Sequence, residues 1–274
     1  METPLVTSLS NPLIKQARAL RQKKARMESG AFLVEGIHHV GEAVAAGWEV
    51  DSVFYAPDLL TSSFARDLIR RLEAASSTSP HSVRSVSAQR KPQPVSAQVM
   101  ESMADKDNPQ GILAIVRQKH LRLDDLKPIR SAAALVSPQD PGNVGTILRT
   151  LDAVGADMLF LLEGGVELYH PGVVRSSMGA IFWKPIVQLA FDEFTEWARQ
   201  KNCHLIGTSA HGDVDYQTVI PRTPWVLVMG SEQKGLSAAQ ANACDVTVSL
   251  PMNGRVSSLN LAVAAGVLLY HFCR

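Results

Sequence analysis

Two patterns of apolar and polar positions alternate along the chain. Short apolar runs are followed by longer segments in which apolar residues recur every three or four positions, and Gly, Pro, Asn or Ser often separates the two. The short runs predict buried strands and the longer segments predict amphipathic helices. Because strands and helices alternate, we expect an α/β protein whose C-terminal sheet is mostly parallel and covered by helices on both faces.

The N-terminal part of the pattern predicts a small α/β domain over residues 1–118. Its expected helices and strands are, in chain order, helix 12–27, strand 31–34, helix 35–46, strand 53–55, helix 63–74, helix 96–104 and strand 111–116. Residues 75–94 are rich in Ser, Pro and Gln, which predicts an exposed loop around a short strand. Residues 119–131 are charged and contain Pro128, and we expect them to form a linker.

A second alternation covers residues 132–274. Its expected elements are strands 132–136, 158–162, 185–189, 204–208, 225–229 and 246–250, with helices 146–154, from about 171, 192–201 and 259–272. The last helix is apolar almost all round, which predicts burial either in the fold or in a subunit interface.

The composition is that of a globular protein large enough for two domains. The chain has 274 residues, of which 46% are hydrophobic and 19% charged. No apolar run is long enough to span a bilayer, and residues 1–30 lack the apolar region of a signal peptide. The three cysteines and eight histidines show no metal-ligand spacing, so we expect a cytoplasmic protein without a metal site.

The net charge of +1 conceals an asymmetry between the two halves. Residues 128–274 carry ten Lys/Arg and twelve Asp/Glu, whereas residues 1–127 carry seventeen and fourteen. Much of the N-terminal excess is a run without acidic residues, made of Lys15, Arg18, Arg21, Lys23, Lys24 and Arg26. Such a run suggests that a polyanion binds at the N-terminal end. A solvated helix face and a basic mitochondrial presequence are the alternatives.

Three loops of the C-terminal domain follow predicted strands, where open α/β sheets bind their ligands. The first, residues 137–146, contains Asn143 between two glycines and opens a helix that carries Arg149. Glycines allow close backbone approach, and a helix N-terminus favours an anionic group. A tight strand-to-helix turn is the structural alternative. A dinucleotide-binding unit with Glu163 as its ribose acid is another, although its G-x-G-x-x-G spacing is missing.

The second and third loops also combine glycines with polar side chains. In residues 229–236, Glu232 lies between two glycines, and the structural alternative is a helix capped by Ser231. In residues 250–260, a serine at 257 or 258 could cap the final helix. Asn260 then lies in the first turn of an apolar helix, where an unpaired amide would cost about 1–3 kcal/mol.

Taken in order, these loops resemble the three motifs of the SpoU/TrmH-like RNA ribose methyltransferases of the SPOUT class. The resembling sequences are DPGNVGTILRTLDAVG (140–155), GSEQKGL (230–236) and LPMNGRVSSLNLAVAAG (250–266). Three N-terminal stretches are similar to the substrate-binding domain of two-domain members, namely SLSNPLIK (8–15), FLVEG (32–36) and NPQGILAIV (108–116). Where many members have Asn-Glu-Gly in the second motif, this chain has Ser-Glu-Gln at 231–233.

The resemblance implies a C-terminal domain folded into a trefoil knot, an exception to the rule that chains do not thread. It implies S-adenosylmethionine as methyl donor, an RNA ribose 2′-hydroxyl as acceptor, and a homodimer formed through the C-terminal domain. Position by position, the expected cofactor-binding residues are Gly230, Leu250, Met252, Ser258 and Leu259. The basic N-terminal run then binds RNA phosphates. The two-domain layout favours ribosomal RNA over transfer RNA.

The resemblance also assigns the proton transfer to Arg149, but a guanidinium is normally never neutral. We therefore hypothesise that Arg149 positions the target phosphate or lowers the pKa of the hydroxyl, with a phosphate oxygen or water as proton acceptor. Asn143, Glu232 and Asn260 would orient Arg149 and the ribose. A dinucleotide-dependent enzyme and a non-catalytic RNA-binding protein are the alternatives of other classes.

Overall fold

The computed structural model describes residues 3–77, 91–105, 108–210 and 214–274. The chain divides into two compact units: Met1–Lys119 with Tyr169–Arg175, and His120–Leu168 with Ser176–Arg274. The segment 169–175 therefore packs with the N-terminal unit, although its chain neighbours on both sides belong to the C-terminal unit. A single boundary near residue 118 does not capture this segment. Within the described residues, no helix has the length and apolarity needed to cross a bilayer.

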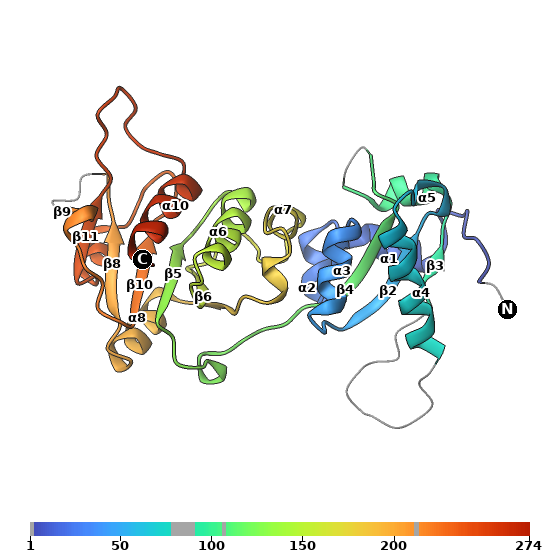
Figure 1. Ribbon diagram of the computed structural model, residues 1–274, viewed down its shortest axis with the longest axis horizontal. Helices are drawn as coiled ribbons and strands as arrows, with labels where there is room; N and C mark the ends of the chain where they lie inside the picture. The colour runs from blue at the N-terminus through green and yellow to red at the C-terminus, as the bar shows by residue number, and fades with distance from the viewer. Residues whose placement is uncertain (1–2, 78–90, 106–107, 211–213) are drawn as a thin grey trace. The chain divides into compact units, whose positions relative to one another are not determined.

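The N-terminal unit contains a four-stranded mixed sheet with the order β1-β4-β2-β3 (Figure 1). β1 (Ala31–Glu35) and β2 (Val50–Tyr55) both pair antiparallel with the central β4 (Ile112–Arg117), and β3 (Gln93–Pro94) pairs parallel with β2. The helices are α1 (Pro12–Ala19), α2 (Lys23–Ser29), α3 (Ile37–Ala45), the 3-10 helix η1 (Pro57–Leu59), α4 (Ser63–Ser77) and α5 (Ala97–Met103). The predicted loop at 75–94 lies mostly outside the described residues.

Helices α1 and α5 cover one face of this sheet. Ile14 of α1 and Met100 of α5 belong to one buried cluster with strand residues such as Leu33 and Ile115. Phe32 and Val34 are also fully buried, and successive strand residues point to opposite faces. Both faces of the sheet are therefore covered.

The single helix predicted for residues 12–27 is in fact two helices, α1 and α2. Asn11 caps α1, because its Oδ1 accepts a hydrogen bond from the backbone N–H of Leu13 at 2.9 Å. At the break, Nη1 of Arg26 donates to the backbone carbonyls of Leu20 and Arg21 at 2.8 and 2.9 Å. Arg26 is only 2% exposed. Its guanidinium thus stabilises carbonyl groups that a continuous helix would have paired within itself.

The C-terminal unit contains a seven-stranded sheet in which every pair of neighbouring strands is parallel. The strand order is β7-β6-β5-β10-β8-β11-β9. The strands are β5 (Ser131–Val136), β6 (Met158–Leu162), β7 (Ile186–Leu189), β8 (His204–Thr208), β9 (Val214–Asp215), β10 (Trp225–Met229) and β11 (Val246–Ser249). The helices are η2 (Leu123–Asp125), α6 (Pro141–Ala153), η3 (Ala180–Phe182), α8 (Phe191–Gln200), η4 (Tyr216–Thr218), α9 (Ala238–Asn242) and α10 (Leu261–Phe272). Helix α7 (Pro171–Ser176) belongs, up to its residue 175, to the N-terminal unit.

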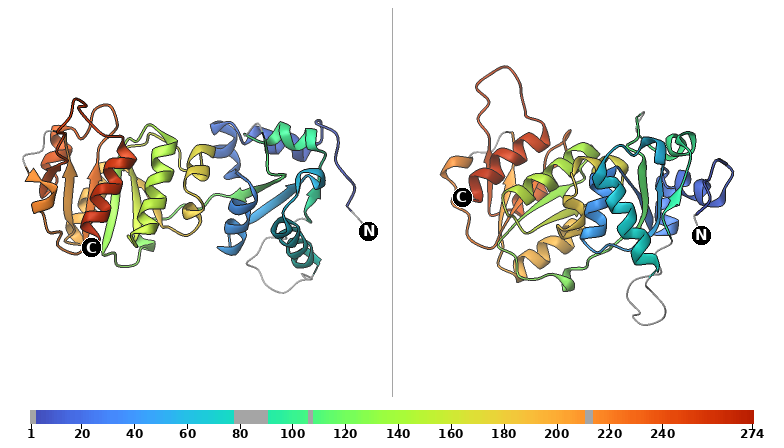
Figure 2. Two further views of the ribbon diagram at one scale, coloured as in Figure 1. Left: turned by 45° about the horizontal axis from the view of Figure 1, so that its top comes forward. Right: turned by 45° about the vertical axis from the view of Figure 1, so that its right-hand side comes forward.

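Helices cover both faces of the parallel sheet. Phe194 and Trp197 of α8 pack against Phe160 of β6 with ring centroids 5.0 Å apart in both pairs. On the other face α6 and α10 lie side by side, and α10 also contacts β10 (Figure 2). The alternating residues Ala133 and Leu135 of β5 are fully buried as well. The predicted α/β fold with a mostly parallel C-terminal sheet is confirmed, while the trefoil knot stays a prediction.

The structure corrects four details of the C-terminal prediction. Helix α6 begins at Pro141, not near residue 146, because Asp140 Oδ1 caps it by accepting from the N–H of Gly142 at 2.6 Å. No helix begins at Ser231, and the cap of the following helix α9 is Ser237. The cap of α10 is Asn260, not a serine at 257 or 258. The short β9 and α9 were not predicted, since neither is long enough to show a period.

Candidate functional site

The three candidate loops leave the carboxyl ends of β5, β10 and β11. Because the sheet is parallel, these ends lie at the same edge. β10 is hydrogen-bonded to β5, so the first loop (137–140) and the second loop (230–236) are direct neighbours. The third loop (250–260) runs from β11 to α10, and Figure 1 shows it extending away from the sheet.

Glu232 of the second loop binds the start of the first. Its carboxylate accepts hydrogen bonds from the backbone N–H groups of Gln139 at 2.9 Å and Asp140 at 3.2 Å, and from Nδ2 of Asn143 at 3.0 Å. Burial alone would raise the pKa of this carboxyl, but these hydrogen bonds outweigh burial and lower it below its ordinary value. An ionised Glu232 therefore holds the two loops together and lies at the N-terminus of α6, where negative charge is favoured.

Asn143 and Asn260 extend this contact to the third loop. Nδ2 of Asn260 donates to Oδ1 of Asn143 at 2.9 Å, so the Asn143 amide uses its donor on Glu232 and its acceptor on Asn260. Oδ1 of Asn260 in turn accepts from the backbone N–H groups of Ala262 and Val263 at the start of α10. Asn143 is 6% exposed. One chain of hydrogen bonds thus joins all three loops, and it supplies the partners that the Asn260 amide needs at the start of an apolar helix.

Gly230 is required by the close turn of the second loop. A Cβ at this position would lie 2.0 Å from the backbone carbon of Gly235 and 2.2 Å from the nitrogen of Leu236. Ser231 and Gly235 form a bridge across the turn, and Gly235 has a positive φ of 64°. The glycines of the second motif therefore allow the chain to fold back on itself beside β10.

The structure does not bring Arg149 into this hydrogen-bond chain. Arg149 is exposed on α6. Within the described part of the chain, no hydrogen bond or ion pair joins its guanidinium to Asn143, Glu232 or Asn260. The three residues position one another and the loops, and they leave Arg149 free to contact a bound molecule.

The candidate cofactor residues of the third loop lie in a segment whose backbone N–H groups are not used by other parts of the described structure. Leu250 and Met252 are half-buried, Ser258 is exposed, and Leu259 is 40% exposed. From Met252 to Leu259, none of the backbone N–H groups makes a hydrogen bond to another described residue. Because backbone N–H groups need partners once they are buried, this loop can offer them to a bound nucleoside. The loop therefore fits a cofactor that is held largely by backbone groups.

The basic N-terminal run separates into exposed and buried residues. The exposed cations are Lys15, Arg18, Arg21, Lys23 and Lys24. Arg26 is the exception, because its guanidinium is buried against backbone carbonyls, and the structure removes it from the set of candidate RNA contacts. A charge pattern cannot make this distinction, since a buried arginine at a helix break looks the same in sequence as an exposed one.

Sequence reasoning missed part of the site. The backbone N–H groups of Gln139 and Asp140 are partners of Glu232, and backbone groups leave no signature in a sequence. Glu163, the candidate ribose acid of a dinucleotide site, instead accepts a hydrogen bond from the backbone N–H of Phe191 at 2.6 Å. Among the described residues, no group of three or more His, Cys, Asp and Glu could hold a metal ion.

The parallel α/β sheet of this chain, with its three motif loops at one edge, has the fold of the SpoU methyltransferases of the SPOUT class. The chain belongs to the SpoU rRNA methylase family, which matches residues 131–270, and residues 11–114 match the MRM3-like substrate binding domain.

Proteins with known activity or structure resemble nearly the whole chain. It is 33% identical over 264 residues to the 23S rRNA (uridine(2479)-2′-O)-methyltransferase of Streptomyces viridochromogenes, covering 93% of this chain and 86% of that protein. It is 27% identical to the 23S rRNA (guanosine(2553)-2′-O)-methyltransferase RlmP of Bacillus subtilis, covering 97% and 98%. The crystal structure of an AdoMet-bound rRNA methyltransferase from Sinorhizobium meliloti superposes with a TM-score of 0.84 at 33% identity, covering 98% and 97%.

Proposed function

We propose that this protein transfers a methyl group from S-adenosylmethionine to the 2′-hydroxyl of a ribose in ribosomal RNA. The observation that carries the proposal is the hydrogen-bond chain Asn260–Asn143–Glu232, which joins the three family motifs at one edge of the sheet. Two of the relatives named above are 23S rRNA methyltransferases, which supports ribosomal RNA as the substrate class. The relatives come from bacteria, which supports a cytoplasmic location.

S-adenosylmethionine supplies a methyl group already activated on a sulfonium, so the protein's task is binding and alignment. Gly230 and the backbone of the third loop would hold the adenosine, together with Leu250, Met252, Ser258 and Leu259. Glu232 and Asn260 would hold the second and third loops in fixed positions around the adenosine. Asn143, which bonds both Glu232 and Asn260, would fix both loops to the start of α6.

Arg149 is exposed at the site and would contact the RNA. Its guanidinium stays charged at neutral pH, so it binds a phosphate or stabilises the developing charge on the 2′-oxygen. The proton of the hydroxyl then passes to water or to a phosphate oxygen. Arg149 has no partner in the Asn260–Asn143–Glu232 chain, so the substrate itself must complete its orientation.

The N-terminal unit would bind the RNA backbone through Lys15, Arg18, Arg21, Lys23 and Lys24. Each phosphate that such a residue neutralises releases counterions, so affinity should fall as salt rises. The unit supplies affinity, while the 2′-hydroxyl at the reaction centre distinguishes RNA from DNA.

The functional form would be a homodimer through α10. Three apolar side chains of this helix, Val263, Val267 and Tyr270, are 53%, 40% and 58% exposed. They recur at four- and three-residue intervals and therefore share one face. An exposed apolar stripe on a terminal helix is suited to packing against its own copy.

The first experiment is transfer of labelled methyl from S-adenosylmethionine to RNA from cells that lack this protein. Wild type should label one ribosomal RNA band, and Arg149→Ala should lose at least about a hundred-fold in rate while still binding RNA. Label in a transfer RNA band would redirect the proposal to that substrate. If wild type binds neither S-adenosylmethionine nor RNA, the proposal is wrong.

A further inference from the structure

A basic hollow on the N-terminal unit contains one acidic residue. It has a volume of about 490 Å³ and is lined by α1, by the turn after it, by the residue two positions beyond α5, and by the start of the segment 169–175. Its ionisable lining residues are Lys15, Arg18, Arg21, Asp105 and His170. The three cations would attract RNA phosphates, whereas a carboxylate without a cationic partner in the same hollow would repel the phosphates.

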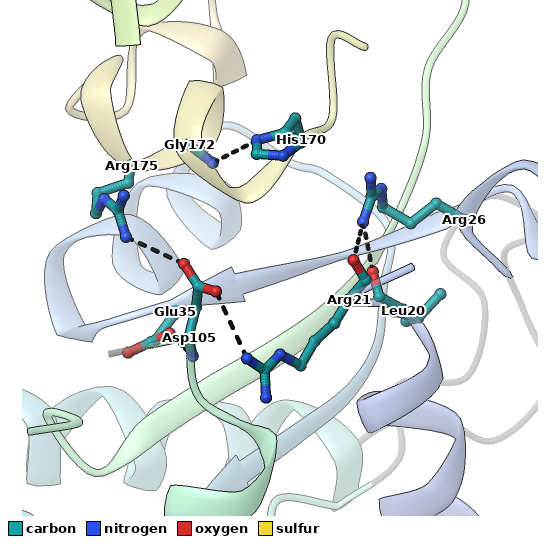
Figure 3. Close-up of polar contacts among 8 residues, drawn as sticks. All are labelled: Leu20, Arg21, Arg26, Glu35, Asp105, His170, Gly172 and Arg175. Carbon is teal, nitrogen blue, oxygen red and sulfur yellow. Dashed lines mark hydrogen bonds and ion pairs between the residues drawn. The ribbon is translucent and has the colours of Figure 1, made fainter. Parts of the chain in front are cut away.

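The Asp105 carboxylate has cationic partners, because it lies between two arginines (Figure 3). Its Oδ1 is 3.8 Å from Nη2 of Arg21, and its Oδ2 is 3.2 Å from Nη1 of Arg175. The backbone N–H of Asp105 donates to Oε2 of Glu35 at 2.8 Å, which ties this residue to the end of β1. Arg175 does not line this hollow, but it lines a smaller neighbouring pocket together with Arg21 and Asp105.

Arg175 comes from a segment that is held to this unit by other contacts. The hydroxyl of Tyr169 donates to the carbonyl of Lys119 and accepts from its N–H, and the Tyr169 ring packs on Phe32 at 4.5 Å. A ring nitrogen of His39 contacts the backbone carbonyl of Arg175 at 3.2 Å. These contacts involve no part of the Arg175 side chain, so its removal should leave the segment in place.

We propose that Arg175 is a positioning residue for RNA binding, which pairs with Asp105 so that Arg21, together with Lys15 and Arg18, stays available to RNA phosphates. The inference deepens the proposed function and rests on it. The ion pair is half-exposed, with Arg175 51% and Asp105 42% exposed, so its contribution to stability is small. Its effect on RNA binding acts through Asp105, since without Arg175 the carboxylate pairs with Arg21 alone and competes with RNA phosphates for that guanidinium.

The test is a double-mutant comparison on the full chain with fragmented ribosomal RNA as probe. Arg175→Ala should weaken RNA binding about three- to ten-fold in low salt, raise KM for RNA and leave kcat at saturating RNA unchanged. In an Asp105→Asn background, the same substitution should change affinity less than about two-fold, because the Asp105 carboxylate is no longer there to compete for Arg21. Arg175→Lys, which keeps the positive charge, should restore most of the affinity.

Arg70→Ala is the matched control, because it removes an exposed cation paired with Asp67 on α4 of the same unit. Its affinity for RNA should equal that of wild type. An equal loss for Arg175→Ala in both backgrounds would mean that Arg175 acts on RNA directly, by contact or by its own charge, and not through Asp105. No loss in either background would remove the ion pair from RNA binding. Both results overturn the proposal. RNA binding without methyl transfer by wild type would count against the proposed function alone, whereas no RNA binding at all would overturn both.

Discussion

At the scale of single residues, Asn143 connects the three motif loops. Its amide donates to Glu232 and accepts from Asn260, and its 6% exposure leaves little room for water to replace either partner. A side chain with one donor and one acceptor on the same short stem is needed here, which explains asparagine at this position. The residue acts by placing the loops, since Arg149 lies outside these contacts.

Asn143→Asp tests this connection with almost no change of shape. At neutral pH the substitution removes the donor to Glu232 and sets two carboxylates against each other. We expect a loss of about 1–3 kcal/mol in the free energy of unfolding and a clear loss of methyl transfer. Chemical denaturation and single-turnover rates measure the two effects. Asn242→Asp, on an exposed asparagine of α9, is the control and should behave as wild type.

The pKa of Glu232 gives a pH dependence with a defined sign. Because this pKa is lowered in the folded protein, the unfolded state binds more protons as pH falls below the ordinary value of 4.5. The stability from Glu232 is therefore complete above pH 4.5 and disappears as pH falls through the folded value. The difference in free energy of unfolding between wild type and Glu232→Gln should shrink over that range. A difference that stays constant from neutral to acidic pH would contradict the ionised hydrogen-bond acceptor.

At the scale of elements, α10 has two different faces. The helix packs against α6 and β10, and its residues Ala265 and Leu268 are at most 1% exposed. The other face carries the exposed stripe of Val263, Val267 and Tyr270. An apolar helix cannot reveal from its sequence which of its faces is buried in the fold and which is left for a partner.

Val263→Glu tests the stripe as a dimer surface. A charge placed in the stripe should convert a dimer to a monomer in sedimentation equilibrium, because burying it unpaired is costly. Ile220→Glu, at a loop position 86% exposed, is the matched control and should stay dimeric. A wild-type protein that is monomeric at micromolar concentration would refute dimerisation through α10.

At the scale of the whole molecule, sequence order and spatial grouping differ. Residues 169–175 lie within the stretch that matches the SpoU family, yet they pack with the N-terminal unit. The chain therefore passes between the two units three times, at residues 119–120, 168–169 and 175–176. The domain that binds substrate in our proposal is completed by a segment of the catalytic half.

The sequence by itself determined the local features of this protein. Apolar runs were enough to predict every strand of the parallel sheet except β9, and the longer apolar patterns were enough to predict the helices α8 and α10, because each of these segments is long enough to be recognised. The order of the three motif loops was enough to point to the family, and parallel strands were enough to bring these loops to one edge.

Only the tertiary structure decided which side chains meet. Asn143 and Asn260 are 117 positions apart, and their contact depends on how α10 packs against α6. Arg26 proved to be buried and Arg175 proved to face Asp105 for the same reason, namely that burial and pairing depend on neighbours distant in sequence. Periodicity and charge describe one segment at a time, whereas a hydrogen-bond partner or an ion pair is a property of two segments after folding.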